Sequence, residues 1–172
     1  MTVEWFGEPG GEPVELSAAD AAWAVTAAEW AARMHDALAP TQVTVEHVGS
    51  TSVAGMPAKP VLDLVVGVPD IADEAAYRPC LESLGLMLRQ REPDHRFFRP
   101  PAGAPRSVHV HVCQHGSNRE RDYLRFRDRL RADPALAAQY AALKLALSQQ
   151  VGEDRAAYNA GKTSFIASVI AD

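Results

Sequence analysis

Apolar residues recur along this chain with two periods, one typical of helices and one typical of strands. From Trp23 to Leu38 they return every three or four positions, which predicts an amphipathic helix over residues 18–38. Ser17 and Asp20 have the spacing of a capping box and are expected to begin that helix. Helical patterns and their flanking caps and breakers predict four more helices, over residues 70–84, 118–131, 134–150 and 154–170.

Shorter stretches, rich in β-branched residues or alternating between apolar and polar positions, predict strands. In residues 107–113 valines alternate with His109 and His111, so the two histidines should share the face opposite the core. Residues 61–68 are almost continuously apolar apart from Asp63, as in a buried strand. Further strands are expected over residues 42–48, 86–91 and 95–99. The order of these elements predicts an α+β fold with one mixed β-sheet flanked by helices and a helical C-terminal third.

The composition agrees with one domain spanning residues 1–172. Hydrophobic residues make up 47% and charged residues 23%, ordinary proportions that exclude disordered and fibrous classes. No apolar run approaches the length of a membrane span, so no membrane partner is expected. The two cysteines, Cys80 and Cys113, are too few for a disulfide scaffold, and the N-terminus lacks the features of a secretory signal. These features predict a cytoplasmic protein.

Positive charge is concentrated in one quarter of an acidic chain. The net charge is −5, yet residues 89–131 hold eleven arginines against five acids. This favours a localised anionic ligand, and the acidic pI argues against nucleic acid as the partner. A solvated helix face with i,i+4 ion pairs would give the same pattern. Four of the arginines lie on predicted strands, where they could clamp phosphates or a carboxylate or simply face solvent: Arg89, Arg91, Arg96 and Arg99.

The segment between the strands predicted over residues 42–48 and 61–68 carries the strongest chemical signal. It begins with a turn whose N–H and hydroxyl groups suit an anion, formed by Gly49, Ser50, Thr51 and Ser52. Lys59 is the lysine expected to contact phosphate, although a solvated loop lysine would look the same. Asp63 is a carboxylate within an apolar run, which is costly unless it is paired or bound to a metal. A phosphate cradle beside such a carboxylate is what phosphoryl or nucleotidyl transfer requires.

The histidines on the strand predicted over residues 107–113 are candidate metal ligands. His109 and His111 should lie about 7 Å apart along the strand, because each residue rises by about 3.3 Å. With His47 or Asp63 nearby they could hold a metal ion. They could equally be partly buried residues that line a pocket and form hydrogen bonds. The other histidines are expected to be ordinary surface or loop residues: His35, His95 and His115.

Several of these residues together resemble the GrpB family. The run from His47 to Val53, followed by Gly55, by the Ala-Lys-Pro run ending at Pro60 and by Asp63, is similar to that family's motif. The resemblance covers roughly residues 45–170. It continues with weaker matches at His109-Val110-His111, Phe126-Arg127-Asp128, Tyr140 with Lys144, and Tyr158 with Lys162. Such tyrosine–lysine spacings also arise when a lysine stem packs on a ring.

The resemblance implies the nucleotidyltransferase superfamily, whose fold is that of the DNA polymerase β palm. Gly49 and Ser50 would then hold the triphosphate of a nucleotide such as ATP or GTP, and Asp63 would ligate Mg²⁺ or Mn²⁺. The same pocket would include His47, Lys144 and Lys162. Active members carry a second acid two positions later, where this chain has Val65, and a third on a neighbouring strand, where it has histidines. Imidazoles beside one carboxylate suit Zn²⁺ or another transition metal better than Mg²⁺.

Three hypotheses about function follow from this pattern. The first is an enzyme that transfers a nucleoside monophosphate to a hydroxyl or amine of a small molecule. The second is a non-catalytic module that binds a nucleotide or phosphate compound and has lost the second acid. The third is a metalloenzyme based on His109 and His111.

Overall fold

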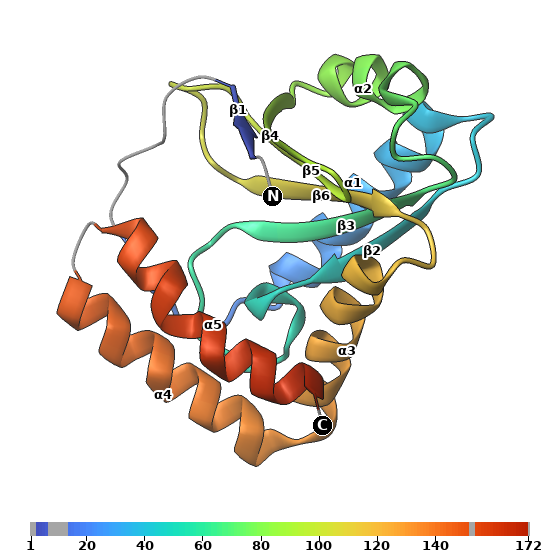
Figure 1. Ribbon diagram of the computed structural model, residues 1–172. Helices are drawn as coiled ribbons and strands as arrows, with labels where there is room; N and C mark the ends of the chain where they lie inside the picture. The colour runs from blue at the N-terminus through green and yellow to red at the C-terminus, as the bar shows by residue number, and fades with distance from the viewer. Residues whose placement is uncertain (1–2, 7–13, 152–153, 172) are drawn as a thin grey trace.

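The computed structural model describes residues 3–6, 14–151 and 154–171, which form a six-stranded mixed β-sheet with helices on both faces (Figure 1). The strands are β1 (Glu4–Trp5), β2 (Thr44–Val48), β3 (Leu62–Val68), β4 (Met87–Glu92), β5 (His95–Arg99) and β6 (Val108–Gln114). The helices are α1 (Ala22–Leu38), α2 (Glu74–Ser83), α3 (Asn118–Ala132), α4 (Pro134–Val151) and α5 (Arg155–Ala171), with a short 3₁₀ turn, η1 (Ser50–Ser52), after β2. The predicted α+β class, with a mixed sheet and a helical C-terminal third, is confirmed.

The strands lie in the order β1-β4-β5-β6-β3-β2, which makes β3 and β6 neighbours although they are far apart in the sequence. These two strands pair in parallel, and their register sets Asp63 beside His109 and Val65 beside His111. The other pairs among the described strands are antiparallel. Because side chains alternate across a sheet, Asp63 and both histidines emerge on one face.

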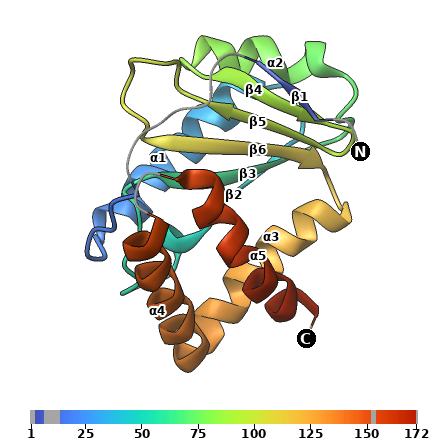
Figure 2. The ribbon, with the colours of Figure 1, turned by 60° about the vertical axis from the view of Figure 1, so that its left-hand side comes forward.

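The two faces of the sheet are covered by different helices (Figure 2). Met34 of α1 and Tyr77 of α2 belong to the large core that buries the leucines and valines of β3 and β6. On the opposite face Tyr123 of α3 packs against a small cluster that includes Val65. Helices α4 and α5 lie beyond α3 on that side and pack on α3 and the loop after η1. Burial of apolar surface on both faces, worth about 25 cal/mol per Å², holds these layers together.

The prediction that Ser17 caps α1 is wrong, and the helix begins four residues later than expected, at Ala22. Ser17 instead forms an isolated β-bridge with Ala58, each backbone N–H donating to the other residue's carbonyl at 2.8 and 3.1 Å. The Asp20 carboxylate accepts a hydrogen bond from the Ala22 N–H at 2.8 Å. A long-range backbone contact thus displaces a cap that the local sequence favours. Helix α2 likewise begins at Glu74 rather than at residue 70.

The strand β1 has no counterpart among the predicted elements, because two residues are too few to show a periodic pattern. It forms the edge of the sheet beside β4 and brings the N-terminal segment next to elements from the middle of the chain. In the part of the chain that the structure describes, no helix combines the length and apolar character needed to cross a bilayer.

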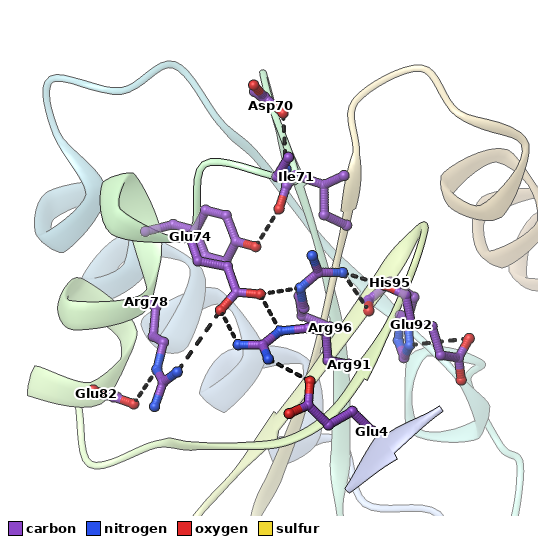
Figure 3. Close-up of polar contacts among 12 residues, drawn as sticks. Glu4, Asp70, Ile71, Glu74, Arg78, Glu82, Arg91, Glu92, His95 and Arg96 are labelled. Carbon is purple, nitrogen blue, oxygen red and sulfur yellow. Dashed lines mark hydrogen bonds and ion pairs between the residues drawn. The ribbon is translucent and has the colours of Figure 1, made fainter. Parts of the chain in front are cut away.

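An ion cluster joins this edge of the sheet to α2 (Figure 3). We call it the Glu74 cluster; it consists of Glu74, Arg91, Arg96 and Glu4. Arg91 donates to both carboxylate oxygens of Glu74, at 2.6 and 2.7 Å, and to Glu4 at 2.5 Å. Arg96 donates to Glu74 at 2.5 Å. These contacts lower the pKa of Glu74 to about 2, chiefly through the hydrogen bonds from Arg91.

Candidate functional site

A cavity of about 430 Å³ lies on the face of the sheet that carries Asp63. Its floor is formed by side chains from β3, β5 and β6, and one wall is the turn at Gly49 and Ser50. The remaining walls come from Lys59 before β3, from α4 and from the first turns of α5. We call it the basic cavity, after the six lysine and arginine side chains described below.

Gly49 brings the polar turn into direct contact with Asp63. Its φ of 69° and ψ of −172° lie in a region that only glycine occupies readily. A Cβ atom at this position would lie 2.5 Å from Asp63 Oδ2, so a larger residue would displace the carboxylate. The backbone needs this close approach because Val48 pairs with Asp63 across β2 and β3. Asp63 and Ser50 therefore border the same cavity.

The Asp63 carboxylate contacts both histidines of β6. Oδ1 lies 3.2 Å from His109 Nδ1 and 3.6 Å from His111 Nε2. Burial alone would raise the pKa of Asp63, but the two imidazoles outweigh it and hold that pKa well below its usual range. Burial also lowers the pKa of His109, so the pair consists of an ionised carboxylate and a neutral imidazole that donates through Nδ1. His109 Nε2 is buried and has no hydrogen-bond partner among the described residues.

His111 extends this contact into the interior. Its Nδ1 lies 3.0 Å from the Tyr123 hydroxyl and 3.0 Å from His95 Nε2. His95 is 5% exposed, so the prediction that it is an ordinary surface or loop residue is wrong. Burial, together with the nearby His111 and arginines, lowers the pKa of His95 to about 2. The result is a connected set of polar side chains that begins at Asp63 and continues along this face of the sheet to Tyr123 of α3.

The chain has three lysines, and all three line the basic cavity. They come from three separate elements, Lys59 from the loop before β3, Lys144 from α4 and Lys162 from α5. Lys144 is 2% exposed, and its ammonium donates to the Pro57 carbonyl at 2.5 Å. Burial and the neighbouring lysines lower the pKa of Lys144 to about 7, and burial and Lys59 lower that of Lys162 to about 8.

The lysines also pack on tyrosine rings, as the four-residue spacings suggest. The Lys144 ammonium lies 5.1 Å from the centre of the Tyr140 ring. Two ammonium groups flank Tyr158, that of Lys162 at 4.4 Å and that of Lys59 at 5.2 Å from the ring centre. Ring contact and cavity lining are therefore compatible, because the ammonium groups lie over tyrosine rings that line the same cavity.

Three arginines and one tryptophan complete the lining. Arg89 and Arg99 are 7% and 5% exposed and reach the cavity from β4 and β5. Arg106, from the loop before β6, and Trp5, from β1, were not predicted, because no local pattern distinguishes either of them. Six basic side chains thus line the cavity, and among the described residues that do so, Asp63 is the one carboxylate.

Two of the expected residues do not line the basic cavity. The Ser52 hydroxyl donates to the Gly49 carbonyl at 2.6 Å, and Ser52 faces a separate groove beside Leu130. His47 lies behind the turn, with Nε2 2.9 Å from the Thr51 hydroxyl. Burial lowers the pKa of His47 to about 4, although the nearby Asp63 carboxylate acts in the opposite direction. Ser52 and His47 therefore support the turn from behind.

The side chains around Asp63 do not form a metal cage. Among the described residues, no group of three or more His, Cys, Asp or Glu side chains has the arrangement of a metal site. Asp63 is already in contact with both histidines, and Val65, at the position of the second acid, is 1% exposed in an apolar cluster. Two-metal catalysis needs clustered oxygen ligands, and this cavity offers one carboxylate. The residues present thus do not fit a pair of Mg²⁺ ions.

A smaller cavity of about 380 Å³ adjoins the first. Asp63, His111 and Lys162 line both. The smaller one is also lined by Arg119 and Asp122, but most of its other walls are apolar, such as Phe126 of α3 and Ile166 of α5. Molecules bound in the two cavities would therefore both lie next to Asp63.

Comparison with known proteins gives a consistent result. The family model described as "GrpB protein" matches residues 13–172. A UPF0157 protein of Streptomyces coelicolor is 44% identical over 168 residues, which cover 98% of this chain and 88% of the relative. The crystal structure of the conserved protein GrpB from Enterococcus faecalis is similar with a TM-score of 0.80 and 29% identity, covering 91% of this chain and 95% of that one. The Cid1 poly(U) polymerase bound to MgATP matches with a TM-score of 0.47 and 13% identity over 76% of this chain and 45% of that one, too low to establish any shared chemistry.

Proposed function

The chain belongs to the GrpB family, and we propose that it binds a nucleoside polyphosphate, or a related small molecule with several phosphate groups, in the basic cavity. The phosphates would lie against the turn at Gly49 and Ser50, and lysine and arginine side chains would neutralise their charge. This is the function that the arrangement of charges supports best.

One observation carries the proposal: every lysine of the chain converges on a single cavity with three arginines and one carboxylate. Burial, and then the neighbouring lysines, lower the pKa values of Lys144 and Lys162, because a charged ammonium group is unfavourable in a partly buried site beside like charges. A protein gains from such an arrangement when an anion of matching charge binds there. Several phosphates on one molecule match it better than a single carboxylate does.

Phosphate binding should raise the pKa values of Lys144 and Lys162, because a nearby anion favours the ammonium form. Since these pKa values are about 7 and 8 in the free protein, binding near pH 8 should take up protons from solution. Affinity should weaken as the pH rises from 6 to 9, when both ammonium groups lose their charge. Calorimetric titration in buffers of different ionisation enthalpy measures the proton uptake directly.

The proposed binding relies on the protein's own cations. We therefore expect ATP, GTP and inorganic tripolyphosphate to bind in the presence of EDTA. The sequence-based expectation of Mg²⁺, Mn²⁺ or Zn²⁺ stays a prediction, which the same titrations with each metal added would test. A requirement for metal would contradict neutralisation by lysine and arginine alone and would restore Asp63 as a metal ligand.

The decisive experiment compares two variants that each remove one positive charge. Lys162→Met should weaken tripolyphosphate binding by roughly 10- to 100-fold, since a hydrogen bond to a charged group contributes about 1.5–3 kcal/mol. Arg125→Gln is the matched control, because Arg125 is exposed on α3 and does not line the cavity. Equal affinities in both variants, or no binding of any phosphate compound to the unaltered protein, would refute the proposal.

A second candidate function, nucleotidyl transfer, is favoured by the adjoining cavity. A nucleotide in the basic cavity and a small acceptor in the smaller cavity would meet at Asp63, which lines both. The acceptor's hydroxyl or amine would bond to the α-phosphorus, releasing pyrophosphate and a proton. Incubation with α-labelled nucleotides and a panel of small hydroxyl and amine compounds tests it. Label transfer that Asp63→Asn abolishes would support this function, and binding without any transfer would leave the protein a binding module.

A further inference from the structure

Trp5 is an unusual side chain for the edge of a sheet. It is 63% exposed, while every other Phe, Trp and Tyr that the structure describes is buried or half-buried. Large aromatic rings normally contribute to stability by burial, so the exposure of Trp5 leaves much of its indole available for contact with another molecule. Trp5 also lines the basic cavity that we propose binds the phosphate compound.

Contacts on both sides of the strand hold β1 in place at the edge of the sheet. Trp5 pairs with Gln90 in the sheet, and its neighbour Phe6 donates a backbone hydrogen bond to the Arg89 carbonyl at 2.9 Å. On the other side Glu4 is bound by Arg91 of the Glu74 cluster (Figure 3). The Arg91 guanidinium also lies 4.9 Å from the centre of the Phe6 ring.

A β-bulge in β4 shapes the same region. Leu88 pairs with Phe98 and Gln90 pairs with Phe97, so the pairing register shifts at Arg89. Such a bulge redirects side chains locally. Here Leu88 faces the core, whereas Arg89 lines the cavity next to the strand that carries Trp5.

The order of the strands sets the distance between the two ends of the cavity. Asp63 lies on β3 and Trp5 on β1, and β6, β5 and β4 lie between them. Four inter-strand spacings of about 4.8 Å give roughly 19 Å along the sheet. Arg99 of β5 and Arg89 of β4 line the cavity between these ends. An extended molecule with phosphates at one end can reach both, and inorganic phosphate cannot.

We infer that Trp5 is the stacking surface for the base of the bound nucleotide. This inference rests on the proposed function, and it adds the class of group at the far end of the ligand: a flat aromatic ring. The phosphates lie against the lysines and the turn at Gly49, and the base lies on the indole of Trp5. Stacking explains why an aromatic side chain is fixed at the cavity while its ring stays exposed.

Tryptophan fluorescence offers a direct test, because the chain has three tryptophans and only Trp5 lines the cavity. Trp23 and Trp30 pack on the core from α1, so a Trp23→Phe and Trp30→Phe double variant leaves Trp5 as the one emitter. We expect at least one of ATP, GTP, CTP and UTP to quench its emission on binding, and tripolyphosphate to bind without quenching.

A second experiment measures affinity in the otherwise unaltered chain. Trp5→Ala should weaken binding of the tightest-binding nucleotide by about 5- to 150-fold and leave tripolyphosphate affinity unchanged. Trp5→Phe should weaken nucleotide binding less than Trp5→Ala does, because a phenylalanine ring can still stack on a base.

The outcomes separate the two proposals. If tripolyphosphate binds as tightly as every nucleotide, and Trp5→Ala changes neither, the stacking inference is refuted while the phosphate site stands. If Trp5→Ala weakens tripolyphosphate as much as the nucleotides, Trp5 supports the cavity and does not contact a base, which also refutes it. If neither class of compound binds, the proposed function fails and the inference fails with it.

Discussion

Arginines of the same two strands serve two different regions of this molecule. Arg91 and Arg96 point to the side of α2 and belong to the Glu74 cluster. Arg89 and Arg99 point to the other side and line the basic cavity. In the cluster, two carboxylates balance two guanidinium groups within 2.5–2.7 Å. In the cavity, six basic side chains share one carboxylate among the described lining residues.

The difference in charge balance separates a structural role from a ligand-binding role. Charges that are neutralised within the protein stabilise the fold, as the low pKa of Glu74 shows. Burial and neighbouring lysines lower the pKa values of Lys144 and Lys162, so their charged forms are disfavoured in the folded protein, a cost that a bound anion would offset. Removing the charge of Glu74 should therefore lower stability, and removing that of Lys162 should raise it.

The largest effect is expected from Glu74→Gln, which leaves Arg91 and the nearly buried Arg96 without their shared carboxylate. The free energy of unfolding should fall by roughly 3 kcal/mol, as for other broken pairs that are largely buried. Glu74 has its pKa lowered from 4.5 to about 2, so its stabilisation is present above pH 4.5 and is lost as the pH falls toward 2. Urea denaturation at pH 7 and pH 3 measures both effects.

The control for this variant is Glu82→Gln on the same helix. Glu82 pairs with Arg78 at 2.8 Å, but both side chains are about 40% exposed, so less than about 1 kcal/mol should be lost. Tripolyphosphate affinity should stay the same in both variants, because neither residue lines the cavity. If Glu74→Gln and Glu82→Gln lose the same free energy of unfolding, the Glu74 cluster stabilises the fold no more than an exposed ion pair does.

A smaller loss, of roughly 2 kcal/mol, is expected from Gly49→Ala. The new Cβ atom would strain the backbone and press on Asp63, so nucleotide affinity should fall together with stability. Gly55→Ala is the matched control, because Gly55 also has a positive φ but a Cβ atom there would meet nothing within 4 Å. It should cost about 1 kcal/mol and leave affinity unchanged. If the two variants have the same stability and the same nucleotide affinity, the close contact between the turn and Asp63 is not needed for binding.

The smallest effect is expected from Lys162→Met in the absence of ligand, which should raise stability by about 1 kcal/mol near pH 8. The pKa of Lys162 is lowered from 10.5 to about 8, so between these values the unfolded chain binds more protons than the folded one. Its contribution to stability therefore rises with pH through this range. Lys162→Met should remove this pH dependence of the free energy of unfolding. Because the tyrosines titrate in both proteins, the difference between the two stability curves gives the contribution of Lys162 alone. If Lys162→Met is less stable than the unaltered protein, the charge of Lys162 does not cost the folded protein stability and the contrast with the Glu74 cluster is wrong.

Local patterns were enough to predict most of the fold. Alternation of valine with His109 and His111 predicted one buried and one cavity-facing side of β6, which the structure confirms. Apolar stripes predicted the helices over residues 18–38 and 134–150, because amphipathic helices pack through one face whatever lies opposite. The exceptions are ends and edges: Ser17 is taken by a backbone bridge to Ala58, and the short β1 gives no periodic signal.

By itself, then, the sequence determined the α+β class, the helical C-terminal third and the pairing of a polar turn with Asp63, since these depend on residues close together in the chain. Only the tertiary structure decided that Lys59, Lys144 and Lys162 share one cavity, that His95 is buried and that Trp5 lies at the cavity's far end. The physical reason is that strand order and helix packing bring distant segments together. The charge balance of a site depends on that convergence, and no local pattern encodes it.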